Sequence, residues 1–446
     1  MTLFNSFLLF IRVFFSDEKN IDKKFFIAKK GLFYKTSYRV QQAQLNDVFV
    51  GVKFFYKSLF LIYSPYNNQG LFSQKGNYLI FDGDSKQKND RLNYLSSVLR
   101  LDKSNFRYLA LDKFSGVKSI GFKFKLTFFI CVVFLIVFPF TVFSKNRALY
   151  ALFLLSIIEN ILFLDLLLES GLNYVYYFFP FENDANFSAL LLSQNNIEVH
   201  KVPGPNSLYH NHKYLLADKI SFCSEFQFEQ HEYLKKNWVV GQIFKWPLYG
   251  YENLKPYFNT NDNQKPKPYK LGFISSGIWR REELGKIPVK KADFESEKKL
   301  IHLLVDYLSA RKISTLYIYL HPIEKDNLEV YSKAVSYYKN KFDNVECVFS
   351  EFDKSSYSSF NLVDTTIAAH STSNLQRLFC GYKTMYALLD YESNMFEGTA
   401  LQNISFNSKS EICTYLDQLI NLSEKDYFNS NDLYFYNYNK YASFLN

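Results

Sequence analysis

Residues 313–389 alternate strand-like and helix-like segments, and this pattern limits the possible folds more than any other feature of the chain. Short apolar and aromatic runs are separated by a helix-like run at 328–341 and by a shorter one at 375–380 that stops before Gly381. Strands that alternate with helices form a parallel sheet with right-handed crossovers. The expected strands are Leu316–Leu320, Val345–Phe349, Leu362–Ala369 and Thr384–Leu389.

Two polar loops follow strands of this expected sheet. His321-Pro322 follows the first strand, and the sequence Ser-Thr-Ser-Asn at 371–374 follows the third. Ligands of parallel sheets bind beyond the carboxyl ends of the strands. Hydroxyls and backbone N–H groups at a helix start favour phosphate, and Pro322 restricts the backbone beside the imidazole. Each loop alone also fits an ordinary turn or helix cap. Their occurrence on one sheet favours an anion-binding site.

A third loop has similar chemistry. The apolar run Leu271–Ile274 is followed by Ser275-Ser276-Gly277 and then by a pair of arginines that begins at Arg280. A glycine-containing loop after a strand, with guanidinium groups next to it, can bind phosphate or carboxylate. A solvated basic turn is the alternative. The expected anion-binding residues of the three loops are Ser275, Gly277, Arg280, His321, Pro322, Glu324, Ser371, Thr372, Ser373 and Asn374.

The spacing of these loops resembles a known family. A strand that ends in His-Pro, followed fifty residues later by an Asp-containing strand that ends in Ser-Thr-Ser, is similar to bacterial sialyltransferases and related glycosyltransferases of surface polysaccharides. The resemblance covers residues 170–390. It implies an α/β fold of the GT-B type, in which two Rossmann-like domains face each other across a crevice. It also implies a nucleotide-sugar donor, often a CMP-sugar, that is bound by the His-Pro and Ser/Thr loops.

The chain of 446 residues is long enough for two domains. A polar segment at 257–268, rich in Asn, Asp, Lys and Pro, reads as a linker. We therefore expect an acceptor-side domain at 1–256, a nucleotide-sugar domain at 269–420 and a C-terminal tail helix at 421–446. The strands expected in the first domain include Phe25–Ala28, Leu59–Ser64, Tyr78–Phe81 and Tyr174–Phe179.

The segment 122–170 is the most apolar part of the chain. Leu126–Ser144 lacks charged residues and approaches the length that crosses a bilayer, but basic residues flank it on both sides. Monotopic insertion, a buried core helix and a true span all remain open, and we expect insertion from one face. The net charge of +9 suits an anionic donor or an anionic membrane face and is too diffuse for nucleic acid. The expected location is the cytoplasmic face of the bacterial inner membrane.

The general base is expected in an acidic loop of the first domain. Glu182 and Asp184 follow the aromatic strand Tyr174–Phe179, and related surface-glycan transferases look similar at this point. The acidic pair followed by Gly that many sialyltransferase-like enzymes carry is absent, and Asp82-Gly83 is only half of it. A solvated acidic loop is the alternative. The expected catalytic residues are Glu182, Asp184 and His321.

We therefore expect a membrane-associated, inverting and metal-independent glycosyltransferase without a bound cofactor. Its partners would be a nucleotide-sugar donor, possibly carrying sialic acid or a related acidic sugar, and a glycan or lipid-linked glycan acceptor. Five scattered cysteines form no CxxC pair, which fits a reducing compartment without structural zinc. One rival hypothesis is a polyol-phosphate transferase of wall-polymer synthesis, which would use the same anion-binding loops. A non-catalytic polytopic membrane protein is a weaker alternative, because charged residues fill the chain outside 122–170.

Overall fold

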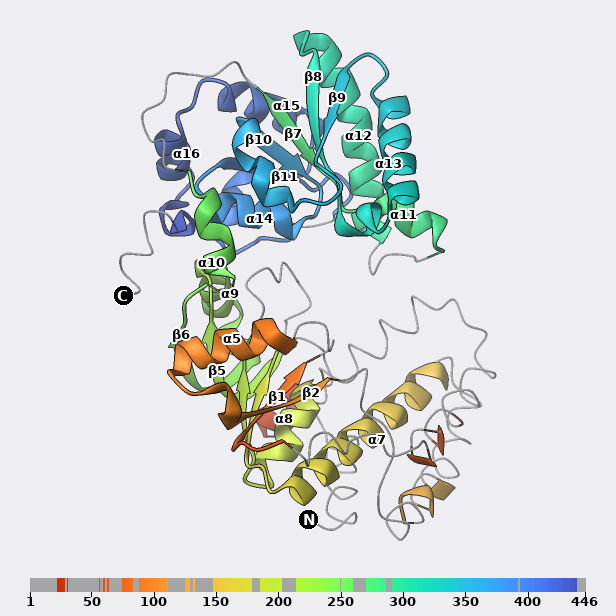
Figure 1. The fold of residues 1–446 in the computed structure, drawn as a ribbon, viewed down its shortest axis with the longest axis vertical. Coiled ribbons are helices and arrows are strands. Elements are labelled where there is room, and N and C mark those ends of the chain that lie inside the picture. The colour runs from red at the N-terminus through yellow and green to blue at the C-terminus, as the bar shows by residue number, and fades with distance from the viewer. Residues whose placement is uncertain are drawn as a thin grey trace. The chain divides into compact units, whose positions relative to one another are not determined.

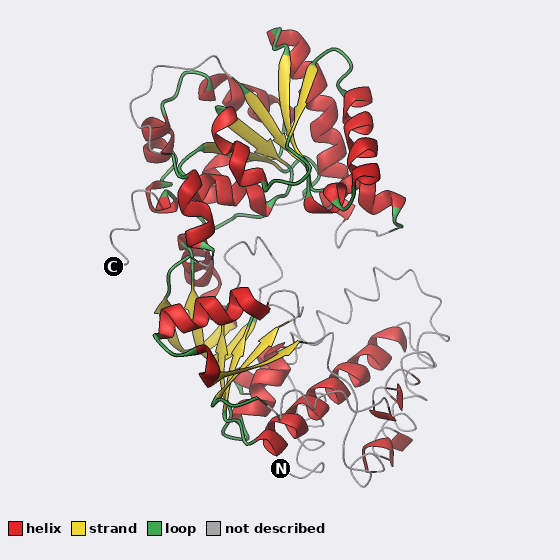
Figure 2. Cartoon of the chain, in the orientation of Figure 1, coloured by secondary structure: helices red, strands yellow, loops and turns green. Residues whose placement is uncertain are grey.

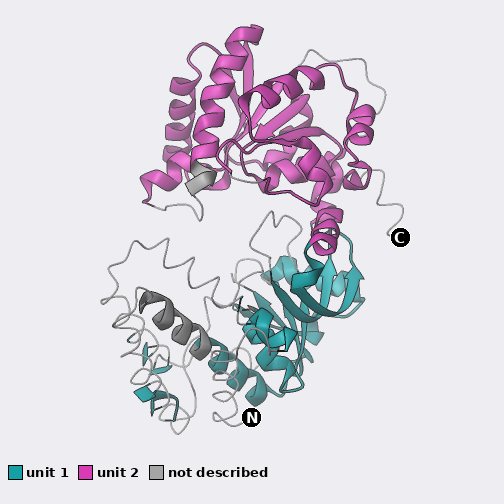
Figure 3. Cartoon of the chain, turned by 180° about the vertical axis from the view of Figure 1, so that it is seen from behind, with its two compact units in different colours: residues 1–204, 211–223, 234–249 teal, residues 205–210, 224–233, 250–446 magenta. Residues whose placement is uncertain are grey.

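The computed structural model divides the chain into two compact units, which Figure 3 shows in separate colours. The first unit comprises residues 1–204, 211–223 and 234–249, and the second comprises 205–210, 224–233 and 250–446. The structure describes residues 22–28, 30, 56, 59–60, 62–63, 74–82, 88–110, 125–128, 131–132, 147–178, 185–202, 214–248, 250–259, 270–285, 291–391 and 394–438. Residues 260–268 of the expected linker lie outside these ranges.

The first unit contains a six-stranded sheet in the order β2-β1-β3-β4-β5-β6, and all its neighbouring strands are parallel. Its direction of winding reverses between β1 and β3, so the carboxyl ends of these two strands form a switch point. The elements of this unit are β1 (Tyr78–Asp82), α5 (Lys88–Leu99), η2 (Lys103–Asn105), β2 (Phe106–Ala110), α7 (Arg147–Ser170), β3 (Tyr174–Tyr177), α8 (Ala185–Ser193), β4 (Glu198–Lys201), β5 (Leu215–Phe222), η4 (Lys235–Asn237) and β6 (Trp238–Lys245).

Both faces of this sheet are covered, as Figure 2 shows. Side chains alternate between the faces along a strand. Ile80 packs with Leu95 of α5 on one face, whereas Leu79 and Phe81 pack with α7 and α8 on the other. A parallel sheet that is buried on both sides requires apolar residues at successive positions, which explains the run Tyr-Leu-Ile-Phe in β1.

Two strands expected near the N-terminus are wrong. Phe25–Ala28 is helical, and the described residues of Leu59–Ser64 are helical as well. Short apolar runs do not reveal by their periodicity whether they are buried strands or buried helices. Conversely, β6 escaped sequence analysis, because its residues Gly241 to Lys245 are exposed and give no buried-strand pattern.

Part of the apolar segment 122–170 packs in the hydrophobic core of the first unit. The described side chains of α7 include Ile161, Phe163 and Leu167, which are buried against β1 and α8. Within the described residues, no helix combines the length and the apolar character needed to cross a membrane. Most of Leu126–Ser144 lies outside those residues. The membrane association of this segment therefore stays a prediction.

The second unit contains a six-stranded parallel sheet in the order β12-β11-β10-β7-β8-β9 (Figure 1). This is the strand order of a Rossmann fold, in which the winding reverses beside the first strand. Its strands are β7 (Leu271–Ile274), β8 (Thr315–Tyr319), β9 (Glu346–Phe349), β10 (Thr365–Ala368), β11 (Lys383–Ala387) and β12 (Ser405–Phe406). Its helices and 3₁₀ turns are α9 (Glu225–Leu234), α10 (Tyr251–Leu254), η5 (Lys255–Tyr257), α11 (Ile278–Glu283), α12 (Lys291–Arg311), η6 (Pro322–Lys325), α13 (Leu328–Lys341), η7 (Ser356–Leu362), α14 (Thr372–Phe379), η8 (Ala400–Ile404), α15 (Lys409–Leu419), α16 (Glu424–Ser430) and η9 (Tyr434–Tyr436).

Helix α9 belongs to the second unit although it connects β5 to β6 of the first. The Glu229 carboxylate accepts hydrogen bonds from the backbone N–H of Ala400 at 2.8 Å and from the Tyr436 hydroxyl at 2.6 Å. Phe226 packs edge to face on Phe396. These contacts fix α9 to η8 and to the C-terminal segment of the second unit.

We expect Leu167→Ala to lower the free energy of unfolding by about 2–5 kcal/mol, since it empties a fully buried position in the core of the first unit. The neighbouring change Leu168→Ala removes a side chain that is 43% exposed and should stay within about 0.5 kcal/mol of wild type. Urea unfolding of both variants measures the difference. Equal effects of the two changes would contradict the core role of α7.

Candidate functional site

Three loops meet at the carboxyl edge of the second sheet. Strand β7 pairs with β8 on one side and with β10 on the other, and Phe273 stands level with both Ile318 and Ile367. The loops that follow these strands begin at Ser275, Leu320 and Ala369, so they leave the sheet next to one another. The structure thus places the three sequence-predicted loops at one switch point, where parallel sheets bind ligands.

The loop after β7 is held tightly against its neighbours. The Ser276 hydroxyl donates a hydrogen bond to the carbonyl of His370 in the β10 loop. Gly277 has a φ of +73°, and a Cβ atom at this position would lie 2.6 Å from Cγ2 of Ile323 and 3.2 Å from Cβ of His321 in the β8 loop. Only glycine fits both the left-handed backbone and this close approach.

The imidazole of His321 is held in a defined orientation at this edge of the sheet. It caps the 3₁₀ turn η6, because its Nδ1 accepts a hydrogen bond from the backbone N–H of Ile323 at 3.2 Å. A neutral imidazole whose Nδ1 accepts must carry its proton on Nε2, which leaves an N–H donor for a ligand. Burial, and to a lesser degree the nearby Arg281, lowers the pKa of His321 to about 4. The ring is therefore a neutral donor near neutral pH.

The start of α14 offers hydroxyl groups. Ser371 is the N-cap residue, but its side chain makes no capping hydrogen bond. Thr372 and Ser373 occupy the first turn and are half-buried. Asn374 has a different role, since its fully buried amide accepts from the Thr366 hydroxyl at 2.6 Å and donates to the carbonyl of Met385 at 2.9 Å. We assign Asn374 to the internal support of the loop and not to the ligand.

Two further predicted ligand residues are engaged inside the protein. The Ser275 hydroxyl accepts a hydrogen bond from the backbone N–H of Gly277 and lies 2.6 Å from the Tyr338 hydroxyl. The Glu324 carboxylate is fully buried and accepts from Tyr338 and from the backbone N–H of His321. Ser275, Gly277 and Glu324 therefore shape the loops, and we do not place them against the ligand.

The arginine nearest the site differs from the one that the sequence suggested. Arg280 is paired with Glu283 on its own helix. Arg281 instead donates from Nε to the carbonyl of Ser276 at 3.2 Å and lies close enough to lower the pKa of His321. Arg281 lies one helical turn after Gly277, to whose carbonyl its backbone N–H donates. That spacing is the signal that distinguishes the two arginines.

Two further residues at this edge, Glu297 and Tyr338, are not predicted from the sequence. Glu297 lies in α12 and is fully buried beside the β7 loop, where its carboxylate accepts from the backbone N–H of Ser276 at 2.8 Å. Tyr338 lies in α13, and its hydroxyl connects Ser275 to Glu324. Both come from amphipathic helices far from any loop motif, so the sequence carries no local signal for them.

The expected base residues Glu182 and Asp184 lie outside the described residues. They follow β3, whose carboxyl end is at the switch point of the first sheet. Asp82 ends β1 at the same switch point, but it is buried and paired with Arg91 at 2.9 Å, and it accepts from the Tyr108 hydroxyl at 3.1 Å. Asp82 is therefore a poor candidate for the base.

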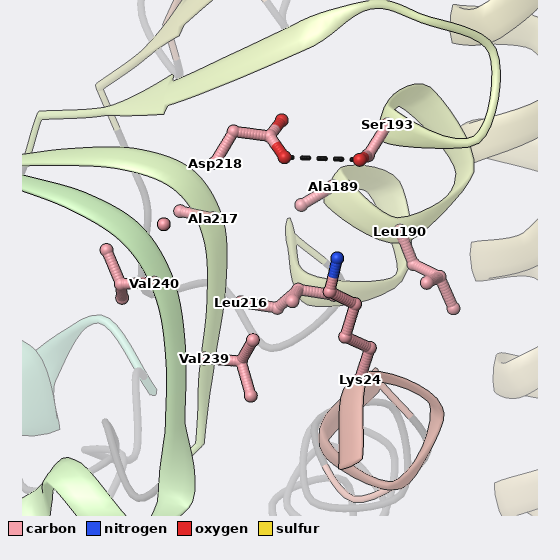
Figure 4. A pocket seen from close by; sticks show the side chains of 10 residues that line it. Lys24, Ala189, Leu190, Ser193, Leu216, Ala217, Asp218, Val239 and Val240 are labelled. Atoms are coloured by element: carbon pink, nitrogen blue, oxygen red, sulfur yellow. Dashed lines mark hydrogen bonds between the residues drawn. The ribbon is translucent and has the colours of Figure 1, made fainter. Parts of the chain in front are cut away.

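The first unit contains a small pocket of about 110 Å³ between α8, β5, β6 and the N-terminal helical residues (Figure 4). Lys24 reaches into it, while Asp218 is bound to the Ser193 hydroxyl at 3.1 Å and to the backbone N–H of Val199 at 2.9 Å. Most other lining groups are aliphatic. Ligand pockets are typically about 300–1,000 Å³, so this pocket is too small for a nucleotide sugar. Among the described residues, no three His, Cys, Asp or Glu side chains are grouped to hold a metal ion.

No protein-family model matches the chain, and no curated protein matches it significantly. Solved structures with a similar chain path include UDP-GlcNAc 2-epimerase from Neisseria meningitidis (10% identity, TM-score 0.39, 82% of this chain and 98% of that chain). Two others are MurG from Acinetobacter baumannii (10%, 0.41, 80% and 95%) and a glycosyltransferase from Rickettsia africae (11%, 0.39, 81% and 94%). At these scores, the likenesses assign neither family nor activity to this chain.

We expect Gly277→Ala to destabilise the protein more than Gly285→Ala by about 1–3 kcal/mol. Both glycines have a left-handed backbone, but a Cβ atom at position 285 would meet nothing within 4 Å, whereas one at 277 collides with Ile323. The pair therefore separates the collision from the backbone strain that both changes share. Chemical unfolding measures the difference, and equal losses would show that the β7 and β8 loops are not in close contact.

Proposed function

We propose that the chain is a nucleotide-sugar-dependent glycosyltransferase of the GT-B type, with the nucleotide bound by the second unit. The observation that supports this most is the convergence of the β7, β8 and β10 loops at the switch point of a sheet with Rossmann strand order. This edge presents a neutral imidazole, hydroxyl groups at a helix start and a guanidinium group, which together suit a phosphate.

In this proposal, His321, Ser371, Thr372 and Arg281 act on the leaving phosphate. When the bond between the sugar and the phosphate oxygen breaks, negative charge builds up on that oxygen. Donors already fixed in position stabilise this charge without reorganising. The Nε2 proton of His321 is held in place by the capping bond at Nδ1, so the ring can donate to the phosphate and keep its own proton.

The finer features of the proposal come from the sequence. The resemblance of the His-Pro and Ser-Thr-Ser motifs to those of bacterial sialyltransferases supports a CMP-sugar as donor, carrying sialic acid or a related acidic sugar. The apolar segment 122–170 and the net charge of +9 support an acceptor at the cytoplasmic face of the bacterial inner membrane, such as a glycan or lipid-linked glycan. We propose Glu182 as the base that deprotonates the acceptor hydroxyl in an inverting displacement.

A nucleotide-binding screen tests the proposal directly. We expect CMP or another nucleotide to bind wild type in isothermal titration calorimetry, and His321→Ala and the double change Ser371→Ala/Thr372→Ala each to weaken that binding. A hydrogen bond to a charged phosphate is worth about 1.5–3 kcal/mol. His302→Ala, an exposed histidine on α12, serves as the matched control.

Equal affinity in wild type and His321→Ala would reject the site. A product assay with CMP-sugars and CDP-polyols then distinguishes sugar transfer from polyol-phosphate transfer, the rival hypothesis for the same loops. Transfer only from a CDP-polyol would replace the proposed donor class and leave the phosphate site in place.

The proposed base gives a separate prediction. Glu182→Gln should reduce turnover by about 10²–10⁴-fold, because the amide cannot take up the acceptor proton. Nucleotide affinity should stay the same, since the donor is bound elsewhere. Glu252→Gln, an exposed carboxylate on α10, should leave turnover unchanged. Full activity of Glu182→Gln would transfer the role to Asp184.

A further inference from the structure

Two buried carboxyl groups lie behind the candidate site and are joined by two hydroxyl groups. Glu297 Oε1 lies 3.4 Å from the Ser275 hydroxyl, which lies 2.6 Å from the Tyr338 hydroxyl. The Tyr338 hydroxyl lies 3.0 Å from Glu324 Oε1. All four residues are buried, with no more than 1% of the surface of each exposed: Glu297, Ser275, Tyr338 and Glu324. We call these four residues the carboxyl network.

The other ends of the two carboxyl groups hold the ligand loops. Glu297 Oε2 accepts from the backbone N–H of Ser276 in the β7 loop at 2.8 Å. Glu324 Oε2 accepts from the backbone N–H of His321 in the β8 loop at 2.8 Å. The carboxyl network therefore connects the two loops from behind, and it fixes the backbone of the residue whose imidazole we place against the phosphate.

The hydroxyl groups of the network supply fewer hydrogens than the network has contacts. Three contacts link the four side chains in a row, but the two hydroxyl groups supply only two hydrogens. The Ser275 oxygen already accepts from the backbone N–H of Gly277 and has one lone pair left for another donor. All three contacts become hydrogen bonds only if one carboxyl group is protonated. With the proton on Glu297, the bonds run from Glu297 through Ser275 and Tyr338 to the Glu324 carboxylate; with it on Glu324, they run in reverse.

We propose that Glu297 and Glu324 share one proton and that this proton locks the β7 and β8 loops in the geometry that binds the donor phosphate. This inference rests on the proposed function for its ligand, whereas the shared proton is inferred from the geometry of the network alone. Glu297 and Tyr338 are then positioning residues, because they act through the loops and do not touch the donor.

The surroundings of the network favour a retained proton. Burial, and then the charge of Glu324, raises the pKa of Glu297 to about 8. Burial also raises the pKa of Glu324 to about 7, although the backbone N–H of His321 and the Tyr338 hydroxyl donate hydrogen bonds to its carboxylate. Tyr337 of α13 faces both carboxyl groups, and Arg281 of α11 faces His321 at the edge of the network.

The raised pKa values set the direction in which stability changes with pH. The pair of carboxyl groups binds the shared proton more tightly in the folded than in the unfolded protein, where each group has a pKa near 4.5. The stabilisation is thus complete below about pH 4.5 and is lost as the pH rises through about 7 to 8. Loss of the shared proton leaves two buried anions and one contact without a hydrogen. We expect the affinity for nucleotide to fall about tenfold per pH unit above pH 8.

Glu297→Gln is the informative variant. Its amide can accept from Ser276 through the oxygen and donate to Ser275 through the nitrogen at every pH, so it replaces the protonated carboxyl. We expect the affinity for CMP and UDP, the probes used, to lose its decline above about pH 8. The decline of stability between about pH 4.5 and pH 8 should also become shallower. Glu329→Gln, an exposed carboxylate on the same helix as Tyr338, should retain both declines.

A spectroscopic readout keeps the test independent of ligand and of variant folding. Infrared difference spectra of wild type should show the carbonyl stretch of a protonated carboxyl that disappears on titration near pH 8, and Glu297→Gln and Tyr338→Phe should each remove or shift this band. If no such band titrates in wild type, or if wild type and Glu297→Gln share one pH profile, the shared proton is wrong. If nucleotides do not bind at any pH while the band and the stability profile behave as expected, the network stands and the proposed function fails.

Discussion

The reversal of winding at β7 is the constraint on which the rest of the second unit depends. Because β7 pairs with β8 on one side and with β10 on the other, three loops that are distant in the sequence leave one edge of the sheet together. A parallel sheet with right-handed crossovers has no other point where loops from both halves of the winding meet. His321 and the hydroxyl groups of α14 gain their common position from this topology, and neither motif could create a site alone.

Buried polar groups explain why several polar residues near that edge point into the protein. An unpaired buried donor or acceptor costs about 1–3 kcal/mol, so the tight loops recruit side chains to satisfy their backbone. Asn374 bridges β10 and β11 near that edge. At the opposite edge, Arg377 is wholly buried, and its guanidinium donates to backbone carbonyls that include those of Val363 and Lys383. The carboxyl network has the same origin, with the difference that its hydrogens do not suffice without a carboxyl proton.

The first unit also contains a parallel sheet, but its strand order and the side chains at its switch point differ. Its switch point lies between β1 and β3. The charge of Asp82 at the end of β1 is neutralised by Arg91, and we therefore propose the acidic residues that follow β3 in the sequence as the source of a base. The apolar residues in the described half of α7 are buried in the core beside the sheet. An apolar run in the sequence can therefore belong to a helix that covers one face of a parallel sheet.

The sequence alone indicated strands β7 to β11 and helices α13 and α14 of the second unit, since alternating buried runs and amphipathic helices carry strong periodic signals. It also identified the His321 and Ser371–Ser373 loops, because turn and cap residues stand next to the strands that they follow. It could not distinguish helix from strand at Phe25–Ala28. Only the tertiary structure turned Asn374 and Glu324 inward and brought Glu297 and Tyr338 to the loops from two separate helices. The reason is that burial and hydrogen-bond pairing depend on packing between distant segments, which leaves no periodic trace in the sequence.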